Sequence, residues 1–98
     1  MNTKNEIITF LEQNKNYLQE KFHITKIGLF GSFARDEQTA LSDVDLLIEL
    51  DDVKNLHDTK ESLKKFLSDS FERSVDLARE KYLKPYAKDM ILKDTIYV

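Results

Sequence analysis

The chain has 98 residues, of which 41% are apolar and 34% charged, and its formal net charge is −3. This length predicts one globular domain with a modest core, and the acidic balance argues against a large basic surface for nucleic acid. Cysteine is absent, which excludes disulfides and thiolate metal sites and favours a reducing, cytoplasmic compartment. The polar N-terminus predicts no signal peptide, and no apolar run is long enough to span a bilayer.

Apolar periodicity alternates between helical and extended patterns along the chain, which predicts a single α/β domain over residues 1–98. An amphipathic helix is expected over 3–22, and Thr3 and Glu6 predict a capping box at its start. Further helices are expected, the last with Pro85 in its first turn, over 32–37, 56–71 and 84–92. Runs rich in β-formers predict strands over 24–30, 44–50, 74–78 and 95–98. Polar turns are expected over 36–42 and 51–55.

Two aspartates, Asp43 and Asp45, open the second predicted strand with only Val44 between them. Residues i and i+2 of a strand face the same way, so the carboxylates are expected on one face, roughly 6.5–7 Å apart. Unpaired anions this close raise each other's pKa, whereas Mg²⁺ binds carboxylate oxygens together with substrate phosphates. The motif therefore indicates a metal site. Because so short a pattern often occurs by chance, the alternative is that both aspartates simply lie in solvent at the end of a strand.

A Gly-Ser pair, Gly31 and Ser32, joins the first strand to the short helix. Glycine allows close approach of a ligand to the backbone, and a helix N-terminus offers free N–H groups. The serine hydroxyl can bind a phosphate oxygen or simply cap the helix. A phosphate-binding turn followed closely by an Asp pair indicates a site for a nucleoside triphosphate carrying Mg²⁺.

A third acid, Asp76, lies in the apolar third strand, where an aspartate has no evident structural purpose. Two-metal sites commonly need a further carboxylate for the ion that activates the attacking group. Asp76 is the best candidate for that carboxylate, and a charge at a strand edge is the alternative.

These residues resemble the signature of the nucleotidyltransferase superfamily that includes DNA polymerase beta, and above all its minimal members, stand-alone domains of about this length. Their pattern of Gly-Ser, Ala-Arg-Gly-Glu, Ser-Asp-x-Asp-Leu and Val-Asp-Leu corresponds here to residues 31–32, 34–37, 42–46 and 75–77. The resemblance implies the nucleotidyltransferase fold, a small mixed β-sheet flanked by helices. One departure is Asp36, which replaces the usual glycine, bears on the loop conformation and leaves the metal ligands intact.

The resemblance also implies a role for each matching residue. Gly31 and Ser32 would hold the triphosphate of ATP. Asp43, Asp45 and Asp76 would be both catalytic and metal-binding. Asp43 and Asp45 would bind two Mg²⁺ ions, and Asp76 would complete the coordination of the ion that activates the acceptor hydroxyl. The hydroxyl would attack the α-phosphorus, and pyrophosphate would leave with Mg²⁺. Arg35 either binds phosphate or pairs with a carboxylate such as Glu37.

Larger members of the family that this chain resembles carry an added helical domain that binds the acceptor, and no such domain is expected here. The family therefore implies a separate partner, an all-helical HEPN ribonuclease toxin in a hetero-oligomer, with AMP transferred from ATP to a toxin tyrosine. No membrane or direct nucleic-acid partner is expected. The alternatives are a catalytically idle subunit that blocks its partner sterically, and a small-molecule nucleotidyltransferase of the aminoglycoside kind.

Overall fold

The structure, a computed structural model, describes residues 1–51 and 54–98. Helices and strands alternate along the chain in the order α1 (Lys4–Gln13), α2 (Lys15–Phe22), β1 (Ile24–Phe30), α3 (Gly31–Ala34), β2 (Val44–Leu50), α4 (Leu56–Phe71), β3 (Val75–Ala78), the 3₁₀ turn η1 (Glu80–Tyr82), α5 (Pro85–Asp94) and β4 (Ile96–Tyr97). The predicted α/β class and small mixed sheet are confirmed. In the described part of the chain, no helix is long and apolar enough to cross a membrane.

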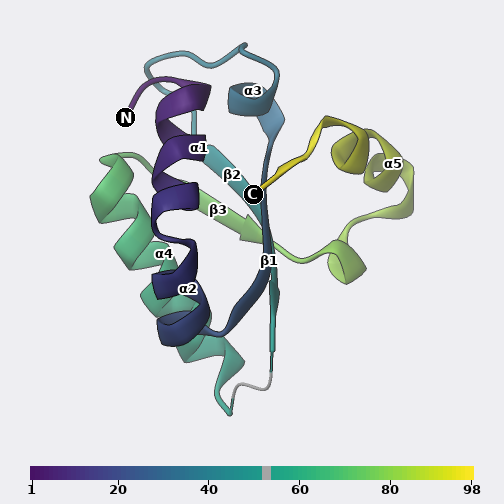
Figure 1. The fold of residues 1–98 in the computed structure, drawn as a ribbon. Helices are drawn as coiled ribbons and strands as arrows, with labels where there is room; N and C mark the ends of the chain where they lie inside the picture. The colour runs from purple at the N-terminus through teal and green to yellow at the C-terminus, as the bar shows by residue number, and fades with distance from the viewer. Residues whose placement is uncertain (52–53) are drawn as a thin grey trace.

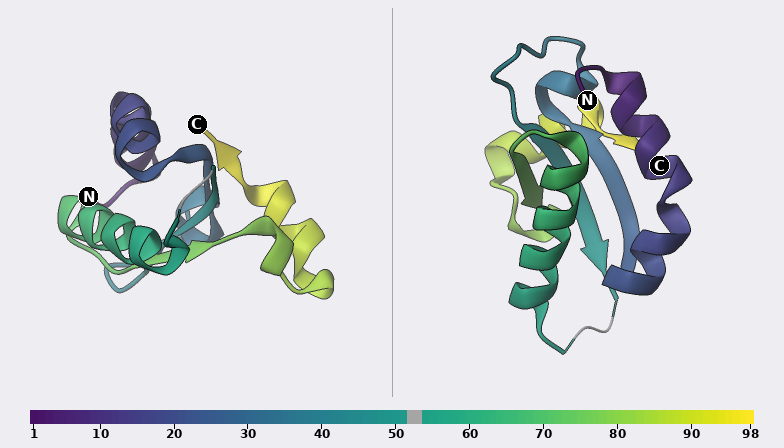
Figure 2. Two further views of the ribbon diagram at one scale, coloured as in Figure 1. Left: turned by 90° about the horizontal axis from the view of Figure 1, so that it is seen from below. Right: turned by 90° about the vertical axis from the view of Figure 1, so that its left-hand side faces the viewer.

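Four strands form one sheet in the order β3-β2-β1-β4. The central pair β1–β2 is antiparallel, β4 adds antiparallel to β1, and β3 adds parallel to β2 after the crossover through α4. Helices α1, α2 and α4 lie on one side of the sheet and α5 lies on the other (Figures 1 and 2). The sheet therefore has one face covered by three helices and one face that is covered only in part.

The core lies between the sheet and the three-helix layer. Alternation in β2 sends Val44, Leu46 and Ile48 into it, and each is at most 1% exposed. Ile7 and Leu11 of α1 and the buried residues of α4 complete the packing on that side. Because one face of β2 is buried, the intervening Asp45, Leu47 and Glu49 must point to the opposite face.

The single helix predicted over 3–22 is wrong, since the structure breaks it at Asn14. The Asn14 side chain donates a hydrogen bond to the Phe10 carbonyl at 2.8 Å, and its backbone leaves the helical region at φ −106° and ψ 11°. Asparagine side chains compete with the helical backbone in this way. The predicted capping box of Thr3 and Glu6 is confirmed.

The other boundaries differ by a few residues. The short helix begins at Gly31 and ends at Ala34, rather than spanning 32–37, and the final helix runs on to Asp94. The turn η1 was not expected from the sequence. The turn expected at 51–55 falls partly on residues 52–53, which lie outside the described residues.

Candidate active site

Two of the predicted acids are direct neighbours in the sheet. Asp45 of β2 and Asp76 of β3 are paired in the parallel register, so both side chains lie on the face away from the three-helix layer. Asp43 lies one residue before β2 and is exposed, and it lines the same open hollow as Asp76. The structure therefore brings all three acids to one end of β2 and β3.

The electrostatics of the site centre on Asp45. Partial burial raises the pKa of this carboxyl to about 6, and the negative charges of Asp76 and then Asp43 add to the effect. The positive charge of Arg35 acts in the opposite direction. The carboxylates of Asp76 and Asp43 thus both repel that of Asp45, and a cation among them would remove that repulsion.

Gly31 brings the end of β1 to the same place. Its predecessor Phe30 is paired with Asp45 across the β1–β2 ladder, and Gly31 itself adopts a positive φ of 76°. A Cβ atom added at Gly31 would overlap the Asp45 carboxylate, so a side chain there would have to displace Asp45. Ser32 follows on α3, partly exposed. The turn at Gly31 and Ser32 therefore lies directly beside Asp45.

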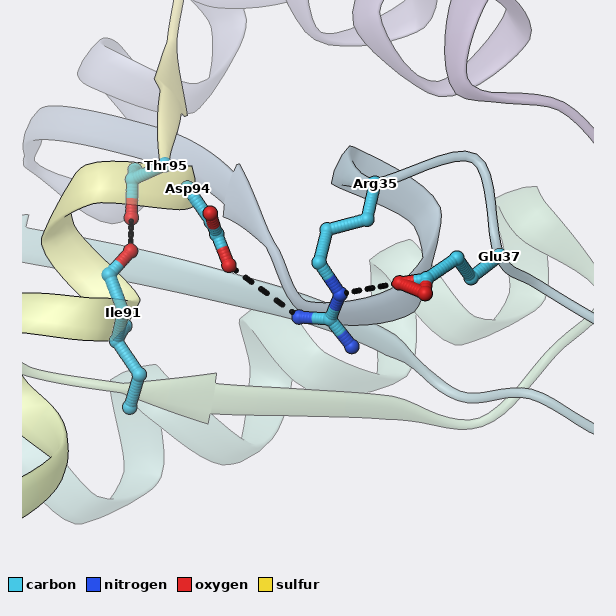
Figure 3. A network of polar contacts seen from close by, with 5 residues as sticks. All are labelled: Arg35, Glu37, Ile91, Asp94 and Thr95. Atoms are coloured by element: carbon cyan, nitrogen blue, oxygen red, sulfur yellow. Dashed lines mark hydrogen bonds and ion pairs between the residues drawn. The ribbon is translucent and has the colours of Figure 1, made fainter.

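Arg35 ends the short helix next to these residues. Its Nε donates to Glu37 Oε1 at 2.8 Å, and its Nη1 donates to Asp94 Oδ2 of α5 at 3.5 Å (Figure 3). The bond with Glu37 raises the pKa of the Arg35 guanidinium. The predicted pairing with Glu37 is thus present, and the side chain is still 44% exposed. Asp94 was not predicted as a partner, because the two residues are far apart in the sequence and no local pattern relates them.

Asp36, the departure from the family pattern, has a positive φ of 57°. This left-handed region is where glycine is favoured, and aspartate is among the side chains that tolerate it best. Asp36 also forms an ion pair with Lys4 of α1, at 2.9 Å. The loop therefore keeps a conformation suited to glycine, although it carries an acid.

The donor set suits Mg²⁺ when the substrate contributes ligands. In the regions 1–51 and 54–98, no group of three or more His, Cys, Asp or Glu side chains is gathered tightly enough to enclose a metal ion unaided. Mg²⁺ usually binds through one or two carboxylates, substrate phosphates and water. The repelling carboxylates of Asp43, Asp45 and Asp76, and the space that Gly31 leaves beside Asp45, fit this mode of binding.

Comparison with known sequences identifies the family of the chain. The nucleotidyltransferase domain family matches residues 11–98. MJ0126 of Methanocaldococcus jannaschii, whose name assigns it provisionally to the protein adenylyltransferases, is 40% identical over the full length of both chains. Protein adenylyltransferase MntA of Thermococcus cleftensis is 34% identical over all of this chain and 98% of its own.

Solved structures share the fold. A structure described provisionally as a minimal nucleotidyltransferase matches with a TM-score of 0.77 and 26% identity, over 96% of this chain and 94% of that one. A toxin–antitoxin crystal structure with AMP-PNP matches with a TM-score of 0.65 and 21% identity, over 96% and 70% of the two chains. A complex of a tri-AMPylated Shewanella oneidensis HEPN toxin with an MNT antitoxin gives 0.56 and 19%, over 96% and 66%.

The family match covers most of the chain, and the adenylyltransferase relatives align along its whole length. The predicted resemblance and the predicted enzyme class are therefore confirmed. This chain is an adenylyltransferase that belongs to the nucleotidyltransferase domain family and, within it, to the minimal nucleotidyltransferases.

Proposed function

We propose that this protein is a Mg²⁺-dependent protein adenylyltransferase that acts as an antitoxin in the cytoplasm. It transfers AMP from ATP to a tyrosine hydroxyl of an all-helical HEPN-type ribonuclease toxin and so neutralises it. The observation that carries the proposal is the alignment of Gly31, Asp45 and Asp76 at the ends of β1, β2 and β3.

Proteins similar to this chain support both ATP as the substrate and a HEPN toxin as the partner. Relatives at 34–40% identity over the whole chain carry the name of protein adenylyltransferases. One structural neighbour is a toxin–antitoxin complex with the ATP analogue AMP-PNP, and another contains an AMPylated HEPN toxin. Asp45 and Asp76 also lie on the sheet face away from the three-helix layer. Asp43 and Asp76 are exposed, so a second protein can reach them. Helix α5 lies on the same side of the sheet (Figure 2).

Each residue has a task that follows from its place. Gly31 lets the triphosphate approach the backbone beside Asp45, and Ser32 donates its hydroxyl to a phosphate oxygen. Asp43 and Asp45 would hold two Mg²⁺ ions with the phosphates, and Asp76 would complete the site on the acceptor side. When bound, Mg²⁺ would lower the pKa of the acceptor hydroxyl and neutralise charge on the leaving pyrophosphate.

In the transfer, one bond to the α-phosphorus forms and one breaks. The tyrosine oxygen forms a bond to the α-phosphorus, the bond between the α-phosphorus and the bridging oxygen breaks, and pyrophosphate leaves with that oxygen. The tyrosine loses its proton to solvent. Arg35, which is still 44% exposed beside Asp45, has donors to offer to a phosphate oxygen.

The test combines the purified protein with a candidate HEPN-type toxin, Mg²⁺ and ATP labelled on the α-phosphate. Label on a toxin tyrosine, mapped by mass spectrometry, is expected with wild type and absent with Asp43→Asn. Asp51→Asn, at the opposite end of β2, is the matched control and should transfer normally.

Other outcomes distinguish the alternatives. An unlabelled complex, with equal toxin inhibition by wild type and Asp43→Asn, would show a steric blocker instead of an enzyme. Label on an aminoglycoside but never on the toxin would show a small-molecule transferase. A covalent mechanism also requires that a substoichiometric amount of wild type inactivates all of the toxin.

A further inference from the structure

One guanidinium outside the family motif, that of Arg73, contacts the N-terminal residues, the loop before Asp43 and the ring of Phe33. Arg73 lies between α4 and β3, and its side chain reaches back across the N-terminus of the protein. Its Nε donates to the Met1 carbonyl oxygen at 2.7 Å, and its Nη2 donates to Asn2 Oδ1 at 2.9 Å. Arginine suits such a junction, because its planar fork offers several donors in fixed directions.

The third nitrogen of Arg73 binds the loop that leads to the first acid. Nη1 lies within hydrogen-bonding distance of three carbonyl oxygens, those of Thr39 (3.2 Å), Ala40 (3.1 Å) and Ser42 (3.0 Å). The Ser42 carbonyl belongs to the peptide group whose nitrogen is that of Asp43. The bond from Nη1 therefore orients the peptide from which Asp43 begins.

The backbone next to Arg73 holds the following residues. The Ser74 carbonyl accepts a hydrogen bond from the Val44 N–H at 2.9 Å, which joins the start of β2 to the start of β3. Asp76 follows two residues later, opposite Asp45. The Arg73 side chain thus holds the loop before β2, and the backbone that follows Arg73 holds the first residue of β2.

The same guanidinium touches the phosphate-binding segment. Its Cζ lies 5.1 Å from the centre of the Phe33 ring, which is completely buried. Phe33 directly follows Ser32 on α3, so a cation packed on this ring restrains the short helix.

We propose that Arg73 is a positioning residue for nucleotidyl transfer, which sets Asp43 relative to Asp76 and to the Gly31–Ser32 turn. This inference rests on the proposed function, because it assigns Arg73 a task in that reaction. Arg73 itself binds backbone carbonyls and touches no reacting atom. Its effect is on the geometry in which Asp43 meets a metal ion.

The experiment compares Arg73→Ala and Arg73→Lys with wild type in AMP transfer and in Mg²⁺ binding. We expect kcat to fall roughly 100-fold in Arg73→Ala, the loss typical of a displacement of about 1 Å in a catalytic group, with little change in KM for ATP. Arg73→Lys should fall between, since an ammonium group cannot span the same acceptors. Hydrogen exchange at the Val44 amide should accelerate in both variants.

The matched control is Arg79→Ala. Arg79 lies at the other end of β3, its side chain is only 12% exposed, and it donates to Glu49 Oε2 at 3.3 Å. Its loss also removes a partly buried arginine, but it leaves the loop before Asp43 untouched. At matched thermal stability, Arg79→Ala should retain the wild-type kcat.

The second readout does not depend on turnover. α,β-Methylene ATP binds without being cleaved at the reacting bond, and calorimetry gives the Mg²⁺ concentration that half-saturates its binding. This concentration should rise in both Arg73 variants and stay unchanged in Arg79→Ala.

A wild-type kcat and an unchanged Mg²⁺ requirement in Arg73→Ala would overturn the inference, and so would equal losses in Arg79→Ala. Should Arg73→Ala fail to fold, Arg73→Lys decides by the same measures. Should wild type itself transfer nothing, the proposed function fails, and the Mg²⁺ requirement for analogue binding still supports or overturns the role of Arg73.

Discussion

Replacing Asp45 by asparagine should make the metal-free protein more stable while it removes activity. Asparagine has nearly the same shape as aspartate and carries no charge, so it ends the repulsion by Asp76 and Asp43. The reason for expecting a gain is that the active site, in the absence of cations, holds an ionised carboxylate under unfavourable conditions.

The size of the effect follows from the pKa of Asp45, which rises from 3.8 to about 6 in the folded protein. Since each pH unit corresponds to about 1.4 kcal/mol, ionising Asp45 at neutral pH costs the fold about 3 kcal/mol at most. The carboxylate is only partly buried, so solvent screening reduces this to about 1–2 kcal/mol. For a domain of this size, the melting temperature of Asp45→Asn should rise by roughly 5–12 °C.

The pH dependence has a definite sign. The folded-state pKa lies above the unfolded value, so the folded protein binds more protons between pH 4 and pH 6. Wild type should therefore lose stability as the pH rises through this window, and Asp45→Asn should lose less. Below pH 4 the two proteins should differ little.

Thermal unfolding followed by circular dichroism, at several pH values between 3.5 and 7.5 without divalent cations, measures these differences. Asp51→Asn is the control for removal of an exposed carboxylate at the other end of β2. A variant no more stable than wild type at pH 7.5, or an advantage that persists unchanged below pH 4, would refute the reasoning. Mg²⁺ with α,β-methylene ATP should stabilise wild type and leave Asp45→Asn nearly unaffected.

Changes at four further positions probe the neighbouring residues. Gly31→Ala should destabilise the protein by at least about 1–2 kcal/mol and abolish transfer, because an alanine at positive φ is strained and its Cβ would overlap Asp45. Chemical denaturation and the transfer assay check this, and normal activity would contradict it. Ser32→Ala should weaken binding of α,β-methylene ATP by about 0.5–1.5 kcal/mol, the net contribution of one hydrogen bond, whereas Asp76→Asn should keep most of that binding and lose transfer. Calorimetry separates the two, and the reverse pattern would mean that the roles are misassigned. Asp36→Ala should lower stability by about 1 kcal/mol and Asp36→Gly should not, since the backbone there is left-handed; equal denaturation midpoints for the two variants would argue against this.

The parts of the fold that the sequence predicts are those encoded by local pattern. The alternation of residues 44–50 predicts β2 and its two faces, and it places Asp45 on the face away from the buried Leu46. The positions of Gly31 and Asp43 in a known motif predict the residue types of the site. Patterns of this kind need no information about distant segments.

The relations between distant segments could not be predicted in the same way. The pairing of Asp45 with Asp76 depends on a register across α4, and the bond from Arg35 to Asp94 joins residues with no shared pattern. Arg73 is equally invisible, because its acceptors are backbone carbonyl groups, which every residue has. The break at Asn14 could not be predicted either, because the apolar stripe of the predicted helix continues on both sides of it.

The parallel pairing of β2 with β3 also determines when activity can arise during folding. Parallel strands cannot meet through a tight hairpin, so Asp76 reaches Asp45 only after the whole of α4 has crossed the sheet. Contacts between segments so far apart in the chain form slowly compared with helices. The β1–β2 pair can bring Gly31 beside Asp45 earlier, but Asp76 is not yet in place at that stage. The regain of transfer activity during refolding should therefore follow the docking of β3, well after most of the helical signal has returned.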